Sequence, residues 1–418
     1  MRLAAIALVA GCMIASPAWL ACPAAAAPSP AQVLVGHVLQ FSQANAWAHL
    51  GTLMSPACQP HYPGTAGINA SAAYIESVLS ARGGTVVEQP FSAAGVPCKN
   101  IMGKWPVPGN ASADIVILAS HYDSRARATQ EADPGKKTQP VPAANDGGSS
   151  TAILLDMARV LNATCQNASL GITREAWLVF FDAEDQGYDG GGQGMDGFDW
   201  IMGSTYMAGN LASLAGNASR VKLLVLLDMV GAPGLQVDQE LNSNQQLLSA
   251  FFSMGQCLGY STYFPTTPSA KLITDDHVPF IGLGIPCIDI IDLDYPQWHT
   301  TSDGIAHVSP DVIGAVGKVA EGFLLTRIAP ATALAITDPS TGRTWTAGSC
   351  QGSSWWFEFV AFVANYWWAL VLAGLAAILL VTYLHQQKQL KKGGRETPPA
   401  ARQVRDGSGA VIPARPSA

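Results

Sequence analysis

The chain has 418 residues, enough for one large domain or two ordinary ones. Apolar residues make up 49 % of it and charged residues 13 %, a balance that allows a sizeable core. The net charge of -7 argues against the basic footprint of a nucleic-acid-binding protein, so no nucleic-acid partner is expected.

The N-terminus has the pattern of a secretory signal peptide, expected to cover residues 1–27. Arg2 precedes an apolar run, and residues 25–27 are alanines suited to cleavage. A lipoprotein-like ending, VAGC at Cys12, is the alternative, although the apolar run before it is short.

Residues 31–329 contain no low-complexity break, internal repeat or clear linker, which indicates one domain. Two of its early segments predict helices from the spacing of their apolar residues: PAQVLVGHVLQFSQANA (30–46) and SAAYIESVLSARGG (71–84). The run TVVEQPF (85–91) predicts a strand.

Four later runs are almost continuously apolar, which is typical of central strands covered by helices on both faces. They are DIVILASHYD (114–123), AWLVFFDAED (176–185), KLLVLLDMVG (222–231) and IPCIDIIDLD (285–294). An amphipathic helix, SSTAILLDMARVL (149–161), lies between the first two. The fold class is therefore α/β, with a mixed, mostly parallel central sheet and helices on both sides.

The C-terminal part predicts a membrane anchor. A stalk over 330–356 leads to an apolar stretch, 357–384, that is long enough to span a bilayer as one helix. The tail over 385–418 begins with several lysines and an arginine, which predicts a cytoplasmic C-terminus. The alternative for 357–384 is a buried core helix.

The expected location of the catalytic domain is therefore extracellular or lumenal, on a single-pass protein of the cell surface or secretory pathway. Removal of the signal leaves an even number of cysteines, which permits disulfides but does not give their pairing: Cys58, Cys98, Cys165, Cys257, Cys287 and Cys350. Glycosylation is also expected, because N-x-S/T sequons occur at Asn69, Asn110, Asn162, Asn167 and Asn217.

Each of the four apolar runs ends in acids or in a histidine followed by an acid. Ligands bind at this edge of open α/β sheets. The candidates at or near these ends are His121, Asp146, Glu184, Asp185, Asp228 and His299. A single strand-end Asp is usually a turn cap, Asp146 could cap a helix, and His121 could be a hydrogen-bonded edge histidine. Four such ends in register are hard to explain as caps alone.

Two histidines with several carboxylates, and no suitable cysteine, favour zinc. A catalytic zinc keeps an open position for water or substrate, and a nearby carboxylate that is not a ligand can then act as general base. Because adjacent side chains point in different directions, Glu184 and Asp185 can divide these two roles between them.

The ordered motifs HYDS, NDGGSSTAILLDMAR, FFDAED, GSTYMA, LLDMVGAP, DDHVPF and WHTTSD resemble those of metallopeptidase family 28. That family contains zinc aminopeptidases and the animal-type glutaminyl-peptide cyclotransferases. The resemblance covers roughly residues 35–329 and implies the zinc aminopeptidase fold.

The resemblance implies a role for each matching residue. The metal ligands shared by both branches match Asp146, Asp185 and His299. The second-zinc ligands of the aminopeptidases match His121 and Asp228. The general acid/base matches Glu184, and acids that orient and buffer its proton in the cyclases match Asp228 and Asp275. Trp298 matches a tryptophan that packs against the glutaminyl substrate, and Tyr295 stands where the family has an aromatic residue.

Several motifs lean towards the cyclase branch, among them the segment before DGFDWIMGSTYMA, the ending GAP and the pair Trp298–His299. There are also departures from the family. Asp185 replaces a more usual Glu, and Asp289 stands where animal cyclases have a histidine in their proton network. A cysteine pair beside the first metal motif is missing, with Ser120 at one of its positions, and the membrane tail is no part of the family core.

Two functions on free peptide or protein N-termini follow from the resemblance. The first is a glutaminyl cyclase with one zinc, which converts N-terminal Gln to pyroglutamate and releases ammonia. The second is an aminopeptidase with two zincs bridged by Asp146. A non-catalytic surface receptor is a third alternative, which the intact Glu184 disfavours. A serine hydrolase is not supported, because no GxSxG elbow follows a strand.

Overall fold

The computed structural model of the chain describes residues 34–347. The expected signal peptide (1–27), membrane helix (357–384) and tail (385–418) lie outside the described residues. Within 34–347, no helix has both the length and the apolar character needed to cross a bilayer.

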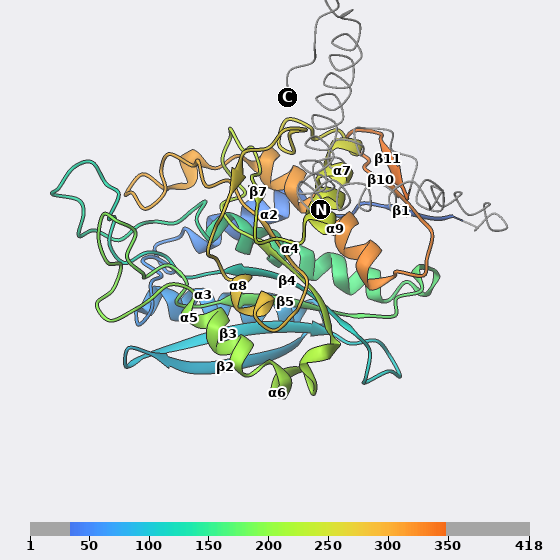
Figure 1. Ribbon diagram of the computed structural model, residues 1–418, viewed down its shortest axis with the longest axis horizontal. Coiled ribbons are helices and arrows are strands. Elements are labelled where there is room, and N and C mark those ends of the chain that lie inside the picture. Colours follow the sequence, from blue (N-terminus) through green and yellow to red (C-terminus); the bar gives the residue numbers. More distant parts are fainter. Residues whose placement is uncertain (1–33, 348–418) are drawn as a thin grey trace, which may run out of the picture. The chain divides into compact units, whose positions relative to one another are not determined.

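A six-stranded mixed sheet forms the centre of the domain (Figure 1). In spatial order its strands are β2 (Thr85–Ala93), β3 (Val96–Trp105), β5 (Glu175–Phe181), β4 (Ile115–His121), β6 (Val221–Leu227) and β9 (Cys287–Ile290). β4, β5, β6 and β9 are parallel, whereas β2 and β3 are antiparallel. The four apolar runs thus form the parallel part of the sheet, and the predicted mixed α/β architecture is confirmed.

Helices pack on both faces of this sheet (Figure 1). One face carries α2 (Gln43–Leu53), α3 (Ala66–Ala81), α4 (Gly148–Cys165), α7 (Gln245–Cys257) and α9 (Pro310–Ile328). The other face carries α5 (Met202–Gly209), α6 (Leu211–Ala215) and α8 (Val278–Ile281). The shorter elements are β7 (Gln239–Glu240), β8 (Ala270–Lys271) and the 3-10 helices Ala168–Leu170, Ala218–Arg220 and Ile305–His307.

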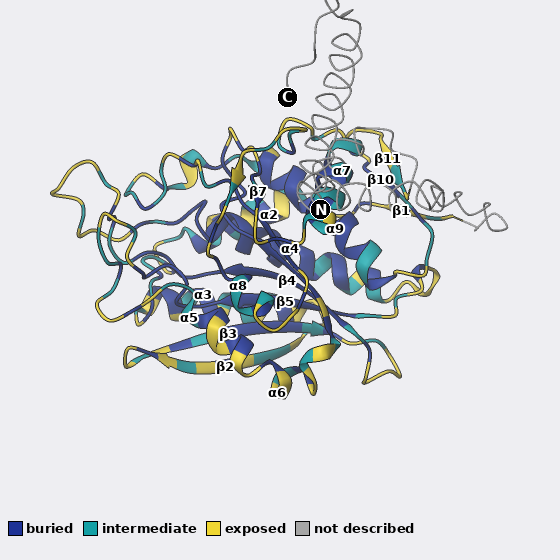
Figure 2. Ribbon diagram, viewed as in Figure 1, coloured by how far each residue is buried: buried dark blue, intermediate teal, exposed yellow. Residues whose placement is uncertain are grey.

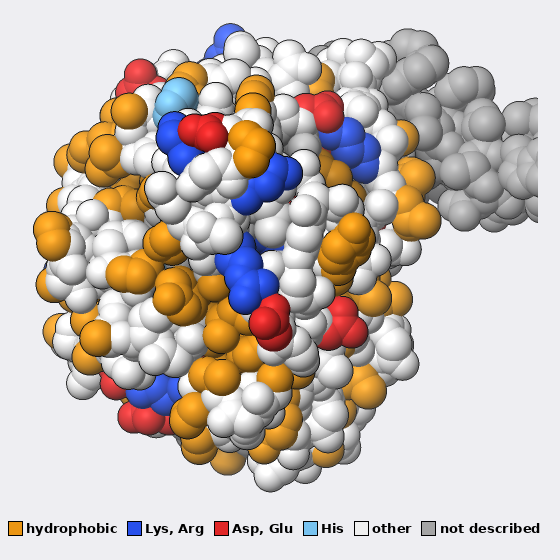
Figure 3. Space-filling model, turned by 90° about the vertical axis from the view of Figure 1, so that its left-hand side faces the viewer, with side chains coloured by type: hydrophobic (Ala, Val, Ile, Leu, Met, Phe, Trp, Pro, Cys, Tyr) orange, Lys and Arg blue, Asp and Glu red, His pale blue; other side chains and the backbone are white. Residues whose placement is uncertain are grey.

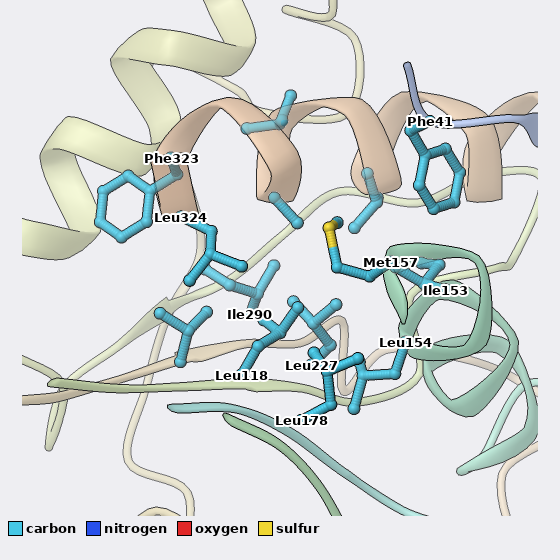
Figure 4. Close-up of a cluster of buried hydrophobic side chains, with 14 of the residues drawn as sticks. Phe41, Leu118, Ile153, Leu154, Met157, Leu178, Leu227, Ile290, Phe323 and Leu324 are labelled. Atoms are coloured by element: carbon cyan, nitrogen blue, oxygen red, sulfur yellow. The ribbon is translucent and has the colours of Figure 1, made fainter. Parts of the chain in front are cut away.

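The central strands are buried along their whole length, because successive side chains enter opposite cores (Figure 2). Leu118 of β4 points into the larger core and Ile117 into the smaller one. Figure 4 shows Leu118 meeting Leu178 and Leu227 from the neighbouring strands, beneath the helices. Truncation of such a side chain to alanine costs about 2–5 kcal/mol.

The N-terminal segment differs from its prediction. The structure contains β1 (Val35–Val38) and then α2, instead of one helix over 30–46. The side chain of Ser42 caps α2 by accepting a hydrogen bond from Asn45 N at 3.3 Å. β1 extends because it pairs in parallel with β10 (Leu334–Thr337), a partner some 300 residues away that local periodicity cannot reveal.

The first part of the predicted stalk also differs. β10 and β11 (Thr344–Thr346) form a three-stranded sheet with β1. Leu334 and Ile336 are buried in the main hydrophobic core. The folded domain therefore continues through at least Thr346, beyond the boundary at 329 that the sequence indicated.

Candidate active site

The carboxyl ends of the parallel strands bring the predicted ligands together. The structure contains two groups of ligand-type side chains: His121, Asp146 and Asp228, and Asp146, Asp185 and His299. Within each group the ligand atoms lie within 4.8 Å of one another, and every member is buried. Asp146 belongs to both groups, which places it between them.

A tight turn positions Asp146 before α4. Gly147 has a φ of +78°, and a Cβ added there would lie 2.7 Å from the His121 ring, so both the turn and the close approach require glycine. The carboxylate of Asp303 accepts hydrogen bonds from Asn145 N at 3.0 Å and from Asp146 N at 3.1 Å. Asp303 therefore anchors the backbone that carries the shared ligand.

Three non-glycine residues at the site have left-handed backbone conformations. They are Ala183 (φ 59°), Met229 (φ 47°) and His299 (φ 55°). Ala183 directly precedes Glu184, and Met229 directly follows Asp228. Such conformations are costly for residues with a Cβ and concentrate at functional sites, where they direct side chains that a regular strand would point elsewhere.

The acidic doublet after β5 divides as predicted between two surroundings. Asp185 Oδ1 lies 2.8 Å from His299 Nε2, inside the second ligand group. Glu184 belongs to neither group. The carboxylate of Asp123 accepts hydrogen bonds from Glu184 N at 3.0 Å and Asp185 N at 3.3 Å, so it holds the backbone of both residues.

Glu184 is buried among other acids. Burial raises its pKa well above the ordinary value, and the negative charges of Asp275 and Asp185 raise it further, although His121 opposes them. Asp275 is also buried, and burial together with Asp228 raises its pKa to about 6. Carboxyl groups with raised pKa values can accept and return a proton near neutral pH.

The residues present fit a metal ion. Among the described residues, Asp146 Oδ2 and Asp185 Oδ2 are buried oxygens without a hydrogen-bond partner. Burial and the charge of Asp185 raise the pKa of Asp146 to about 7, an effect that a bound cation would reverse. Imidazole nitrogen with carboxylate oxygen is a donor set that zinc accepts.

The two predicted substrate-binding residues differ in their placement. Trp298 is half-buried and stacks on His299, with ring centroids 3.7 Å apart, so it lies beside the ligand group. Tyr295 is only 4 % exposed, and its hydroxyl donates to Asp303 at 2.7 Å. Tyr295 therefore supports the Asp146 turn and offers little surface to a substrate.

Asp289 lies in β9 and is fully buried. Its Oδ2 lies 3.7 Å from His277 Nδ1, and His277 Nε2 lies 3.2 Å from Glu240 Oε2. Asp289 stands at the position where the resemblance implies a histidine. A histidine, His277, does lie beside it, but it comes from the segment before α8.

Sequence reasoning missed three residues at the site. Arg125 is fully buried and contacts Asp185, Asp189 lies 2.7 Å from His299 Nδ1, and Trp200 stacks parallel to the His299 ring at 5.8 Å. All three lie in or against the segment 186–201. Its likeness to an insertion of the cyclases indicated the segment, but no local pattern marks which of its side chains turns inwards.

A cavity of about 390 Å³ lies nearby, lined by residues that include Ala232, Asp238, Asp292 and Tyr295. None of the candidate metal ligands lines it. We place the chemistry at the ligand groups, because there the buried oxygens Asp146 Oδ2 and Asp185 Oδ2 have no hydrogen-bond partner.

The loops beyond the strand ends form one side of the domain. On the face shown in Figure 3, positive and negative side chains are interspersed with apolar ones. This face therefore carries no broad patch of one sign.

Comparison with known proteins gives consistent relatives. The family model described as peptidase family M28 matches residues 100–324. A glutaminyl-peptide cyclotransferase of Bos taurus is 25 % identical over 237 residues, which cover 50 % of this chain and 62 % of the relative. The chain thus spans less than two thirds of the length of this curated relative.

Solved structures match over nearly their full length. A glutaminyl cyclase of Porphyromonas gingivalis is 31 % identical with a TM-score of 0.60, covering 69 % of this chain and 100 % of that one. A Zn-dependent exopeptidase of Parabacteroides distasonis is 29 % identical with a TM-score of 0.61, covering 70 % and 99 %. The chain is therefore similar in fold both to a glutaminyl cyclase and to a zinc-dependent exopeptidase.

Proposed function

The chain belongs to peptidase family M28 and resembles its glutaminyl cyclases, and on that premise we propose that it is a zinc-dependent glutaminyl-peptide cyclotransferase. It converts the N-terminal Gln of a peptide or protein to pyroglutamate and releases ammonia. The substrate is a free N-terminus, and the reaction consumes no water.

The observation that carries this proposal is the surrounding of Glu184. This carboxyl group is buried and belongs to neither ligand group, and the negative charges of Asp275 and Asp185 raise its pKa; the pKa of Asp275 is itself raised to about 6. A proton can be held and returned there without release to solvent. Cyclisation needs such a group, because the same proton leaves one nitrogen and joins another.

Zinc at Asp146, Asp185 and His299 would supply a Lewis acid that polarises the side-chain amide carbonyl of Gln. Glu184 takes a proton from the α-amine as its nitrogen bonds to the amide carbon. The same carboxyl group returns that proton to the leaving nitrogen as the C–N bond breaks and ammonia departs. Asp228 and Asp275 orient the carboxyl group of Glu184 and buffer its charge.

Trp298 provides a wall for the glutaminyl side chain. Its ring is half-buried and stacked on His299, so one edge of the site is apolar and flat. A flat apolar wall excludes water from the amide and restricts its rotation, which favours the bent conformation that ring closure requires.

We propose one tightly bound zinc, at the group that contains His299. A co-catalytic aminopeptidase with two zincs is the second candidate, and the complete group of His121, Asp146 and Asp228 supports it. In that reaction Glu184 would deprotonate an attacking water instead of an amine.

A paired assay on one purified preparation tests the function. Pyroglutamate and ammonia release from Gln-peptides is compared with cleavage of Leu-amide and Ala-amide substrates. The proposal predicts equal amounts of pyroglutamate and ammonia and little amide cleavage. Cleavage without cyclisation would establish the aminopeptidase instead.

We propose, from the sequence, that the catalytic domain is extracellular or lumenal and anchored through residues 357–384. Cys257 is disulfide-bonded, which supports an oxidising compartment, although Cys58, Cys98, Cys165 and Cys287 are free. The sequon residues Asn69, Asn110, Asn167 and Asn217 are exposed and thus accessible to glycosylation. Protease treatment of intact cells should remove the domain and spare the tail. Release of the whole chain by a salt wash would contradict the anchor.

A further inference from the structure

The glycine-rich segment GYDGGGQG (187–194) packs directly on the chain around Thr129. A Cβ at Gly191 would lie 2.4 Å from the carbonyl oxygen of Thr129, and a Cβ at Gly192 would lie 2.9 Å from its methyl carbon. These glycines therefore permit a backbone approach that larger residues would block. The segment is held in place as part of the site.

A buried arginine joins this segment to the metal-ligand group. Arg125 is fully buried, and its Nη2 donates to Gly187 O at 2.7 Å and Gly192 O at 3.0 Å. Its Nη1 donates to Asp185 O at 2.9 Å and lies 3.4 Å from Asp185 Oδ1. One rigid guanidinium thus fixes the segment and a candidate zinc ligand relative to each other.

Asp189 completes the connection to the histidine. Its Oδ1 accepts from Gly191 N at 2.8 Å and Gly192 N at 2.9 Å. Its Oδ2 lies 2.7 Å from His299 Nδ1 and 3.4 Å from Arg125 Nη2, and it also accepts from the Thr129 hydroxyl. Although burial opposes ionisation, the bonds from His299 and Thr129 hold the pKa of Asp189 below its ordinary range.

We propose that Asp189, held by Arg125, is a positioning residue that orients His299 and thereby sets the zinc affinity of the site. With Nδ1–H donated to Asp189, the lone pair of Nε2 faces Asp185 and Asp146 and is available to a metal ion. The proposal rests on the zinc site of the proposed function, but not on which reaction that site performs.

The isosteric substitution Asp189→Asn tests this assignment. It removes the charge and puts a possible donor opposite His299 Nδ1. We expect zinc affinity to fall by about 10–100-fold, measured by competition with a chromophoric zinc chelator. The matched control is Asp196→Asn, two residues beyond the glycine-rich segment; its carboxylate pairs with Arg127 at 2.7 Å, and its side chain is 84 % exposed. The control should bind zinc as the wild type does.

A purely structural role would give a different result. It would lower the melting temperature of the metal-free Asp189→Asn variant and leave its zinc affinity, measured far below that temperature, unchanged. Unchanged affinity overturns the proposal. A wild-type chain that binds zinc but does not cyclise Gln-peptides overturns the proposed function and leaves this inference standing, so the two failures are distinguishable.

A measurement on the zinc-loaded wild type covers the case in which the variant does not fold. A His299 Nδ1–H that donates to a carboxylate should give a downfield, slowly exchanging proton resonance, assigned by loss of the signal in His299→Gln. Long-range nitrogen correlations that show zinc bound through Nδ1 would contradict the assignment, because Asp189 would then face the wrong nitrogen.

Discussion

The two ligand groups share Asp146 but hold their histidines in different ways. His299 Nδ1 lies 2.7 Å from a carboxylate oxygen of Asp189. His121 Nδ1 lies 3.6 Å from the nearest carboxylate oxygen of Asp123 and 3.2 Å from its backbone carbonyl. The Nδ1 of His299 thus has a short contact with a carboxylate, whereas the Nδ1 of His121 has a longer one with a backbone carbonyl.

The difference follows from what else each supporting carboxylate does. The carboxylate of Asp123 accepts hydrogen bonds from Glu184 N, Asp185 N and Gln186 Nε2. Both of its oxygens therefore already have donors, and neither makes a short contact with His121. His121 Nε2 is also within 3.2 Å of both Asp146 and Asp228. Burial opposes protonation of both histidines, but the neighbouring carboxylates raise the pKa of His121 well above the ordinary value and raise that of His299 too, so a metal must displace a proton at either group. We expect the tighter zinc binding at the His299 group, because its Nδ1 has the short carboxylate contact that orients the ring.

Paired histidine substitutions give the largest expected effect. His299→Ala should reduce bound zinc from about one ion per chain to near none and abolish turnover, because a tight site loses its nitrogen ligand. His121→Ala should retain the ion. Elemental analysis after dialysis against a weak chelator measures both variants. Equal zinc loss in both variants would contradict a tighter site at the His299 group.

Glu184→Gln should lower kcat by about 10²–10⁴-fold, because the amide cannot accept the proton. Zinc content should not change, since Glu184 is outside both ligand groups. Asp185→Asn is the matched control and should lose zinc. Zinc loss in Glu184→Gln would show that the roles of the doublet are reversed.

The pair Trp298→Ala and Tyr295→Phe separates substrate contact from support of the shared ligand. Loss of the Trp298 wall should raise KM for Gln-peptides by about tenfold. Tyr295→Phe removes one hydrogen bond to Asp303 and should cost about 1 kcal/mol of unfolding free energy, with KM unchanged. If Tyr295→Phe raised KM by more than Trp298→Ala does, Tyr295 would have to contact the substrate directly.

The smallest expected effect is the pH dependence of stability that Asp275 causes. Burial and Asp228 raise the pKa of Asp275 from 3.8 to about 6. Its protonated form therefore stabilises the fold fully below the ordinary pKa, and this contribution is lost as pH rises through about 6.

The melting temperature of metal-free protein should accordingly fall by several degrees between about pH 4 and about pH 6. Asp275→Asn, which stays neutral, should reduce this fall. Parallel melting curves for the variant and the wild type would contradict the assignment.

Much of the fold was predictable, because the parallel strands are continuous apolar runs and α4 has clear helical spacing. β1 and β10 were not predictable, because neither segment has a strand pattern of its own. Each is a strand because it pairs with the other across the two ends of the domain. β3 was missed because VPCKNIMGKW mixes polar and apolar residues without strict alternation.

The site divides in the same way. Most of the predicted ligands stand at or just after strand ends or in a glycine turn, where position along the chain implies position in space, whereas His299 lies in the loop that follows β9. Arg125 and Asp189 act through contacts about 60 residues apart or more, which no local motif encodes. The bond from Tyr295 to Asp303 was not predictable, because residue type alone does not distinguish an aromatic wall from a buried hydrogen-bond donor.

A zinc titration of activity tests the central claim most directly. Metal-free protein receives increasing zinc, and pyroglutamate formation from a Gln-peptide is measured at each step. The account predicts that activity rises linearly and reaches its plateau at one zinc per chain. The contradicting result is no pyroglutamate at any step, together with cleavage of a Leu-amide substrate, measured in parallel, that appears only as a second equivalent of zinc binds.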